Sequence, residues 1–449
     1  NPVAAQKANF SPTIGFAWAA TRDGKTVIRG GAGRYFDPVS LTNSSYINER
    51  QALSPAGTGR RTNIPGSSIT YNGVPLEFSQ RPTSFTAADL LTILPGIRAD
   101  LSAQLNPDNR DFTFRNLDLT KSGGANLSDP DYESAYALHF NLGVQRELAA
   151  DLVLSADFVW RRFLHTFLSG IDYNRFNRQP QGPVIPRCTA AQRNDLTAVC
   201  STGQITFDNT SGIAQYHGVL VRLEKRFSRG VQFLASYALA GFEGSNGTEF
   251  SGNGFNNDDW FENYGPMRTD QRHVLNLSGS LDLPWQFRAS FSVAVHSRPP
   301  FSAYLNGVDF NGDGTQNDLL PGVRVNQFNR GLGKNDLAQL VQTYNNEVAN
   351  RQTTGGQTAP LLTLPVNYGF HDSFFTQDLR LSRTFSLKSE RVRLVLFGEV
   401  FNLFNTANLV QYDGNIANPA EFGKPGARFS QVFGSGGPRA FQLGMRVNF

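Results

Sequence analysis

The sequence predicts an all-β fold, an antiparallel transmembrane β-barrel wall of about eleven strands. Three observations predict it: the composition, segments that alternate apolar and polar residues, and connections that alternate between short and long. The 449 residues include 43 glycines and 36 phenylalanines, and only 17% of them are charged. Mean hydropathy is −0.33, and no apolar stretch approaches the roughly 20 residues of a membrane-spanning helix. The composition therefore argues against a helical membrane protein.

Segments of about ten residues alternate with period two, as strands with one apolar face do. The clearest segment is at the C-terminal end of the chain, where apolar and polar side chains alternate. Its apolar members are Phe441, Leu443, Met445, Val447 and Phe449. The eleven expected strands lie near residues 13–21, 26–36, 135–148, 152–163, 216–227, 231–242, 272–283, 286–297, 374–386, 391–403 and 438–449.

The connections alternate between short and long without exception. The short ones are Arg22–Lys25, Ala149–Asp151, Ser228–Gly230, Pro284–Trp285 and Leu387–Glu390. The long ones are 37–134, 164–215, 243–271, 298–373 and 404–437. Outer-membrane barrels have this arrangement, with tight periplasmic turns on one rim and long extracellular loops on the other. A soluble β-sandwich can mimic the strands but has no reason to keep the alternation. We therefore expect an integral protein of the outer membrane, in contact with its lipid.

Aromatic residues near the expected strand ends fit an interfacial girdle. They are Trp18, Tyr35, Phe36, Trp160, Tyr237, Phe401 and Phe404. Two segments of the long loops predict short helices, 84–104 and 335–349. The second places Leu337, Val341 and Tyr344 on one face.

Charge and motifs exclude several functions. The net charge is +4, and no run of five like charges suggests nucleic-acid binding. The six histidines have no zinc-type spacing, and no nucleophile elbow occurs. We therefore expect a protein that is not an enzyme. The chain begins at Asn1 without a signal segment, which suggests an excerpt of a longer protein.

One polar loop resembles a Ca²⁺-binding loop, which needs oxygen ligands at positions 1, 3, 5 and 7 and a glycine at position 6. Asp309, Asn311, Asp313 and Thr315 occupy the ligand positions. The twelfth position, normally a bidentate glutamate, is a leucine, so Asp318 would have to supply a carboxylate instead. A structural Ca²⁺ is the one cofactor that the sequence suggests. The alternative is a string of Asx turns, which these residues also favour.

The two cysteines, Cys188 and Cys200, lie in the same long loop. An exported loop meets an oxidising compartment, so we expect them to form a structural disulfide. Two free thiols are the alternative.

Several segments together resemble TonB-dependent receptors of the Oar-like kind found in acidobacteria. They are Gly24–Gly31, Phe140–Leu148, Val221–Phe227, Phe233–Tyr237, Asp270–His273 and Phe401–Asn405, followed by the closing strand. The resemblance covers nearly the whole chain. It implies a signal peptide, a carboxypeptidase-regulatory-like domain and a plug upstream of a barrel of about 22 strands. Residues 1–449 would then be part of the barrel domain, its C-terminal half.

The resemblance also implies a function and partners. An extracellular ligand would bind the long loops, and the TonB energy complex, acting through the upstream region, would admit it across the outer membrane. The strand ending at Phe449 is similar to the signal that the barrel assembly machinery recognises. An outer-membrane surface protein for adhesion or export, anchored by the same barrel, is the alternative. The transported or bound ligand is not specified by the sequence.

Overall fold

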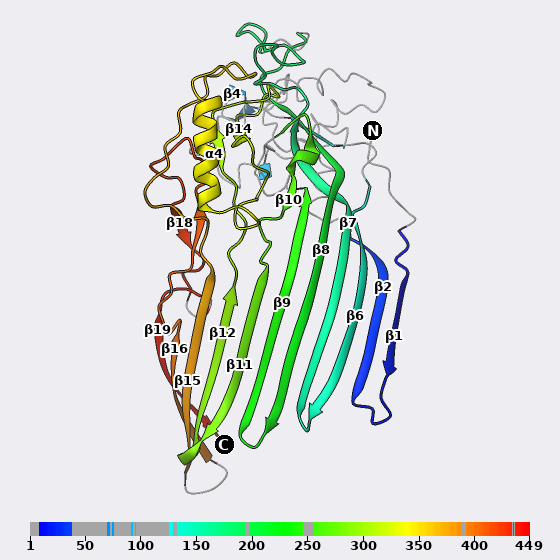
Figure 1. Cartoon of the computed structure of the whole chain (residues 1–449), viewed down its shortest axis with the longest axis vertical. Coiled ribbons are helices and arrows are strands. Elements are labelled where there is room, and N and C mark those ends of the chain that lie inside the picture. Colours follow the sequence, from blue (N-terminus) through cyan, green and yellow to red (C-terminus); the bar gives the residue numbers. More distant parts are fainter. Residues whose placement is uncertain are drawn as a thin grey trace.

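The structure is a computed structural model in which a single curved sheet dominates (Figure 1). It describes residues 9–37, 70–71, 74–75, 91–92, 95, 125–128, 133–193, 198–245, 256–387, 392–432, 434 and 436–449. Eleven strands pair antiparallel in chain order, and two short strands join the sheet at its side, β5 on β8 and β10 on β9. The eleven are β1 (Thr13–Ala19), β2 (Thr26–Phe36), β6 (Tyr136–Ala149), β7 (Leu152–Asp172), β8 (Ile205–Ser228), β9 (Val231–Ser245), β11 (His273–Leu283), β12 (Phe287–His296), β15 (Phe374–Leu387), β16 (Val392–Phe401) and β19 (Ala440–Asn448).

All eleven expected strands are present, and the expected fold class is confirmed. Two strands are longer than expected, because β7 continues to Asp172 and β8 begins at Ile205. The expected loop 164–215 is therefore wrong at both ends. Irregularities in the β7–β8 pairing, the first between Leu164 and Thr166, break the alternation without ending the ladder. Periodicity alone misses such an extension.

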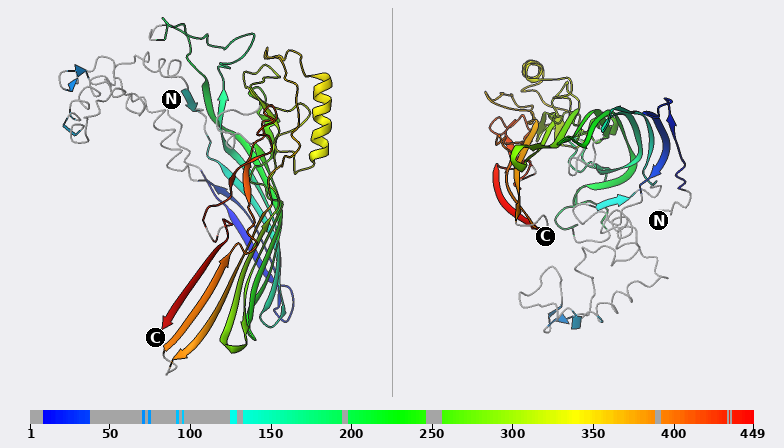
Figure 2. Two further views of the ribbon diagram at one scale, coloured as in Figure 1. Left: turned by 90° about the vertical axis from the view of Figure 1, so that its left-hand side faces the viewer. Right: turned by 90° about the horizontal axis from the view of Figure 1, so that it is seen from below.

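Short connections lie at one end of the sheet, here called the turn end, and long connections lie at the other, the loop end (Figure 1). The sheet is strongly curved, with β1 and β19 at its two edges (Figure 2). The pairing register of the strands shows which side chains lie on each of the two faces of the sheet. The outer face carries exposed apolar side chains such as Phe16, Leu142 and Leu381. The inner face carries Arg29 and Asp157 among other polar residues.

The expected aromatic girdle is present in part. By register, Phe36 and Trp160 lie on the outer face, and Phe404 is exposed and stacks on Phe375 with ring centroids 6.3 Å apart. Tyr35 lies on the inner face instead, where its ring is 5.9 Å from that of His139. The assignment was wrong there because successive strand residues alternate faces, and Tyr35 shares the parity of Arg29.

Two long connections, 298–373 and 404–437, fold together at the loop end into what we call the loop subdomain. It has its own buried core, which includes Phe301, Phe328 and Phe422. Backbone hydrogen bonds join its two parts, from Tyr304 N to Gly414 O (2.9 Å) and from Ile416 N to Tyr304 O (2.9 Å).

Short pieces of secondary structure complete the described residues. They are β3 (Thr70–Tyr71), β4 (Val74–Pro75), β5 (Ala125–Ser128), η3 (Trp260–Asn263), β10 (Tyr264–Pro266), η4 (Pro284–Gln286), β13 (Tyr304–Asn306), β14 (Asn317–Leu319), α4 (Lys334–Glu347), β17 (Leu409–Tyr412) and β18 (Pro425–Arg428). Helix α4 confirms the helix expected at 335–349, and its buried Leu337, Val341 and Tyr344 enter the core of the loop subdomain. Most of the helix expected at 84–104 lies outside the described residues. Within the described part of the chain, no helix is long and apolar enough to cross a membrane.

Candidate functional site

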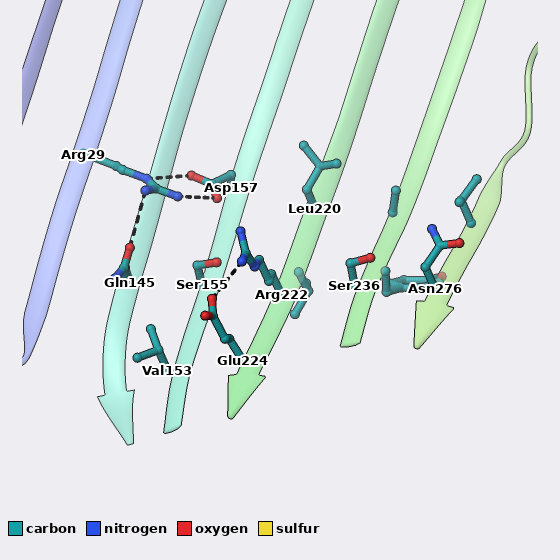
Figure 3. A pocket seen from close by; sticks show the side chains of 14 residues that line it. Arg29, Gln145, Val153, Ser155, Asp157, Leu220, Arg222, Glu224, Ser236 and Asn276 are labelled. Carbon is teal, nitrogen blue, oxygen red and sulfur yellow. Dashed lines mark hydrogen bonds and ion pairs between the residues drawn. The ribbon is translucent and has the colours of Figure 1, made fainter. Parts of the chain in front are cut away.

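A polar pocket of about 450 Å³ lies on the inner face and is lined by residues of β2, β6, β7, β8, β9 and β11 (Figure 3). Arg29 donates to the two carboxylate oxygens of Asp157 from Nε (3.1 Å) and Nη2 (2.9 Å). Arg222 pairs with Glu224 at 2.8 Å. These side chains are partly exposed, and such pairs contribute about 0–1 kcal/mol each. Their main effect is to hold charged groups in fixed positions on the inner wall.

A glycine on β6 leaves room for one of these pairs. A Cβ at Gly143 would overlap the Asp157 carboxylate that pairs with Arg29. Gly143 and Asp157 are partners in the ladder and face the same side. The glycine is thus required by the side chain beside it rather than by a turn.

At the loop end, a buried polar hub joins three long connections. Asn257 donates from Nδ2 to the carbonyl oxygen of Asp172 (2.7 Å) and accepts from Asp172 N at Oδ1 (2.8 Å). The backbone N–H of Asn257 donates to the carboxylate of Asp313. Asp172 ends β7, Asn257 precedes β10, and Asp313 lies in the loop subdomain. The hub therefore fixes these three connections relative to one another.

The hub was missed in the sequence, because its members are far apart along the chain. Asp172 has a second role, because its carboxylate accepts backbone N–H groups from Asn174 (3.0 Å), Phe176 (2.7 Å) and Ile205 (3.1 Å). A short Asp-x-Asn stretch at the end of a long strand was the available signal, and it is too common to be specific.

A buried ion pair makes a further connection between the sheet and the loop subdomain. Asp270, just before β11, pairs with Arg330 of the loop subdomain. Their side chains are only 2% and 4% exposed. Arg330 also donates to the carbonyl oxygens of Arg298 (3.1 Å) and Asn329 (2.7 Å), and Asp270 accepts from Phe242 N (3.0 Å). Asp270 opens one of the segments on which the family resemblance depends, so its place in that segment is structural.

The expected Ca²⁺ loop forms a compact acidic cluster. One carboxylate oxygen from each of Asp309, Asp313 and Asp318 lies within 4.8 Å of the other two, and all three residues are buried. Thr315 Oγ1 lies within hydrogen-bonding distance of the carboxylates of both Asp313 (2.7 Å) and Asp318 (3.0 Å). Asn311 is exposed, and its side-chain oxygen caps the backbone N–H of Asp313 (2.9 Å). The structure thus brings together three of the five candidate ligands directly and places the other two around them.

The electrostatics of the cluster suit a cation. Burial, with smaller contributions from the carboxylates of Asp313 and Asp309, raises the pKa of Asp318 from 3.8 to about 7. Burial likewise raises the pKa of Asp309. No described lysine or arginine forms an ion pair with any of the three carboxylates. Leu320, at the twelfth position of the motif, is fully buried in the core of the loop subdomain. A core leucine therefore occupies the position that a glutamate ligand would hold in the Ca²⁺-binding motif.

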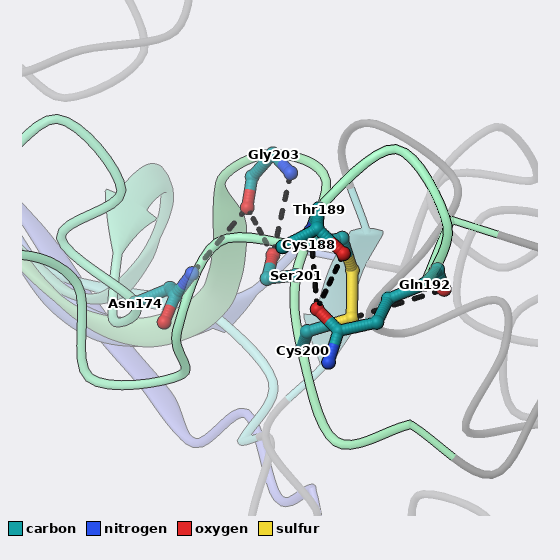
Figure 4. The surroundings of a disulfide bond; sticks show 7 residues. All are labelled: Asn174, Cys188, Thr189, Gln192, Cys200, Ser201 and Gly203. Carbon is teal, nitrogen blue, oxygen red and sulfur yellow. Dashed lines mark hydrogen bonds between the residues drawn. A yellow bond between two sulfur atoms is a disulfide. The ribbon is translucent and has the colours of Figure 1, made fainter. Parts of the chain in front are cut away.

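Cys188 and Cys200 form a disulfide in the β7–β8 connection, with an S–S distance of 2.08 Å (Figure 4). Backbone hydrogen bonds hold the two segments side by side, from Cys188 N to Ser201 O (2.9 Å) and from Ser201 N to Pro186 O (2.7 Å). The bridge closes a small part of this connection, because the two cysteines are 12 positions apart in the sequence.

The closing strand β19 pairs with β16 along its length. Its apolar residues Phe441, Leu443, Met445 and Val447 are exposed on the outer face, and Phe449 is fully exposed. The alternation expected from the sequence is therefore present in the structure.

Two asparagines anchor the connection that follows β16. Asn402 is buried with φ +48°, and its Nδ2 donates to the carbonyl oxygens of Thr406 (2.9 Å) and Gly437 (2.7 Å). Asn408 accepts from Phe375 N (2.8 Å). The Phe401–Asn405 segment thus forms a turn after β16, and its hydrogen bonds attach this turn to the segment before β19.

A family model described as an outer membrane beta barrel domain matches residues 1–442. A search of curated proteins finds no match. Among solved structures, the chain is similar to the outer membrane transporter YddB from Escherichia coli, with 13% identity, a TM-score of 0.47, and coverage of 98% of this chain and 41% of that one.

Two further structures show comparable similarity. For the siderophore receptor PirA from Acinetobacter baumannii, identity is 12%, the TM-score 0.41, and coverage 98% of this chain and 41% of that one. For the ferric enterobactin receptor PfeA from Pseudomonas aeruginosa, identity is 12%, the TM-score 0.43, and coverage 98% and 40%. The chain spans about two fifths of the length of each of these three proteins.

Proposed function

Because the chain belongs to the outer membrane beta barrel domain family, we propose that it forms part of the barrel wall of a TonB-dependent receptor in the outer membrane. Its loop end would then be extracellular and its turn end periplasmic. The ligand binds the extracellular connections and passes along the inner wall when the TonB energy complex acts on the receptor. We propose that the chain carries out transport and is not an enzyme.

The observation that carries this proposal is that the connections at the loop end are held in fixed positions relative to one another. The connections 173–204 and 256–272 and the loop subdomain are joined by the Asp172–Asn257–Asp313 hub and the Asp270–Arg330 pair. Long loops held on a rigid scaffold are suited to recognition, because little ordering entropy remains to be lost on binding. The inner wall below them is lined by charged and amide groups, which suit a polar passage.

We further propose that the acidic cluster holds a Ca²⁺ ion. Asp309, Asp313 and Asp318 would supply carboxylate oxygens, which are the ligands that Ca²⁺ prefers. The two positive charges of the ion would offset most of the negative charge of the three buried carboxylates and so stabilise the loop subdomain beside the hub. This is a structural role and contributes no chemistry to transport.

An uptake experiment tests the transport proposal. Cells lacking the gene, with and without the full-length protein restored, are given a defined mixture of ferric chelates, oligosaccharides and peptides, and depletion of each is measured by mass spectrometry. We expect one class to be depleted faster when the protein is present, and a protonophore to remove that difference. Equal depletion in both strains refutes the proposal.

The same strains test the alternative of surface adhesion. Retention of cells on a solid surface is measured in parallel. If the restored protein increases attachment while depletion of every compound is unchanged, the barrel serves as an anchor and not as a transporter.

A further inference from the structure

An unusual charge lies on the outer face near the turn end. Arg383 of β15 is exposed and is paired in the ladder with Phe287 of β12 and Leu396 of β16. Its neighbours of the same parity, Leu379 and Leu381, are exposed apolar residues that face lipid. Arg383 therefore points from the sheet toward the membrane and not into the passage.

This arginine is unique within its part of the wall. On β11, β12, β15, β16 and β19, every other described outer-face position is uncharged, as the register shows. Six carboxylates of the strands have the opposite parity and lie on the inner face. They are Glu147, Asp157, Glu224 and Asp282 toward the turn end, and Asp378 and Glu399 toward the loop end. Among the residues that the structure describes, none of them forms an ion pair with Arg383.

Aromatic rings hold the guanidinium in place. The Cζ atom of Arg383 is 5.0 Å from the ring centre of Phe287 and 4.8 Å from that of Phe385. Stacking of this kind orders the planar group while its N–H donors stay free for a partner. Trp285 lies in the neighbouring turn η4, which contacts β15, and it is 79% exposed with φ +60°. A tryptophan with this exposure is typical of the boundary between lipid and water.

The depth of Arg383 matches a headgroup. It lies four residues before the end of β15 at Leu387, or roughly 13 Å along the strand at about 3.3 Å per residue. A long basic side chain at that depth extends to the interface and leaves its stem in the apolar region. An arginine in contact with lipid is costly unless an anion is available to it.

We propose that Arg383, Phe287, Phe385 and Trp285 form a binding site for the headgroup of an anionic phospholipid in the periplasmic leaflet. The phosphate accepts hydrogen bonds from the guanidinium, the two phenylalanines orient it, and Trp285 lies at the level of the headgroups. Charge complementarity selects the ligand, because the described outer-face positions of β11, β12, β15, β16 and β19 offer a cation and no carboxylate.

Two other outer-face cations lie at a similar distance from the turn end. Lys225 of β8 is three residues from the end of its strand, and Arg146 of β6 is three residues from the end of its own. Within the described part of the wall, basic groups thus face this leaflet at these three places. Only Arg383 has the aromatic cradle, and it is therefore the position to test.

The test measures lipid selectivity of the purified full-length protein. It is reconstituted in phosphatidylcholine membranes that contain spin-labelled phosphatidylglycerol or spin-labelled phosphatidylcholine, and the motionally restricted fraction is measured by electron paramagnetic resonance. We expect Arg383→Gln to lower the relative association constant for phosphatidylglycerol at this site by about five-fold. Arg383→Lys retains the charge and should lose less.

The matched control is Arg380→Gln. Arg380 lies three residues away on the same strand but on the inner face, where its guanidinium is 3.8 Å from the ring centre of Phe397. This variant should leave lipid selectivity unchanged. Equal selectivity in the wild type and Arg383→Gln overturns the proposal, and so does an equal loss in Arg380→Gln. All three variants are first checked for barrel folding by their mobility in unheated gels.

Discussion

The buried Asp270–Arg330 pair predicts a large local effect of one substitution. Asp270→Ala leaves the Arg330 guanidinium, only 4% exposed, without its carboxylate partner. Removing one member of a buried pair costs about 3–5 kcal/mol, because the remaining charge cannot recover its hydration. The loss also removes the acceptor for Phe242 N. We therefore expect the loop subdomain to open locally while the sheet remains intact.

Hydrogen exchange measured by mass spectrometry on the full-length protein in detergent is the appropriate assay. An opening free energy lowered by about 3–5 kcal/mol corresponds to a fall in protection of about two to four orders of magnitude. The fall should appear in peptides from 298–373 and not in peptides from β6 or β7. Asp270→Asn keeps an acceptor for Phe242 N and loses only the charge, so its effect should be smaller.

The exposed Arg222–Glu224 pair supplies the control. Its side chains are 55% and 42% exposed, and such pairs contribute about 0–1 kcal/mol. Glu224→Gln should therefore change protection by less than about five-fold. If Asp270→Ala changes exchange no more than Glu224→Gln does, the pair does not hold the loop subdomain to the sheet.

Three further predictions concern the acidic cluster, the inner wall and the connection after β16. Without Ca²⁺, the raised pKa of Asp318, about 7 against 3.8, means that the folded loop subdomain binds a proton that the unfolded chain releases. Its stability should therefore fall as pH rises from about 4 to about 7, and Ca²⁺ should remove that dependence, as followed by thermal unfolding with Ca²⁺ or a chelator. Gly143→Ala should lower the stability of the wall by about 1–3 kcal/mol, because the new Cβ displaces Asp157, and the midpoint of heat-modified gel mobility measures this. Asn402→Ala should increase exchange in 404–437, because it removes the buried hydrogen bonds to Thr406 and Gly437 and places alanine at φ +48°.

Each of these predictions has a contrary outcome. An unfolding midpoint that does not depend on Ca²⁺ at pH 7 contradicts the metal assignment. Gly15→Ala adds a Cβ 3.5 Å from the nearest atom, so a Gly143→Ala effect no larger than that of Gly15→Ala contradicts the overlap argument. Asn402→Gly tolerates the backbone angle but lacks the amide, so unchanged exchange in 404–437 of this variant contradicts the hydrogen-bond argument.

The wall of the barrel could be predicted because its signals are local. Alternation along each strand, as in Phe441 to Val447, and the contrast between short and long connections are both visible within a few residues. Helix α4 was predictable for the same reason. The extension of β7 to Asp172 was not, because its bulges shift the parity of the pattern.

The loop end could be predicted only in part, because its contacts are not local. The acidic motif placed Asp309, Asp313 and Asp318 in one loop, and the structure shows them clustered. The sequence pattern did not indicate that Asn257, some fifty residues earlier, would donate to Asp313. Side chains that meet only through folding leave no spacing for a motif search to detect.

The shared core of the loop subdomain has a consequence for how this surface changes during evolution. Phe301 and Phe328 come from one connection and Phe422 from another, yet they pack together. A deletion within either connection would expose the apolar residues of the other. Surface segments under pressure from phages or antibodies often vary independently, but these two would have to vary in concert. An antibody against this region should accordingly recognise a discontinuous epitope that neither peptide reproduces alone.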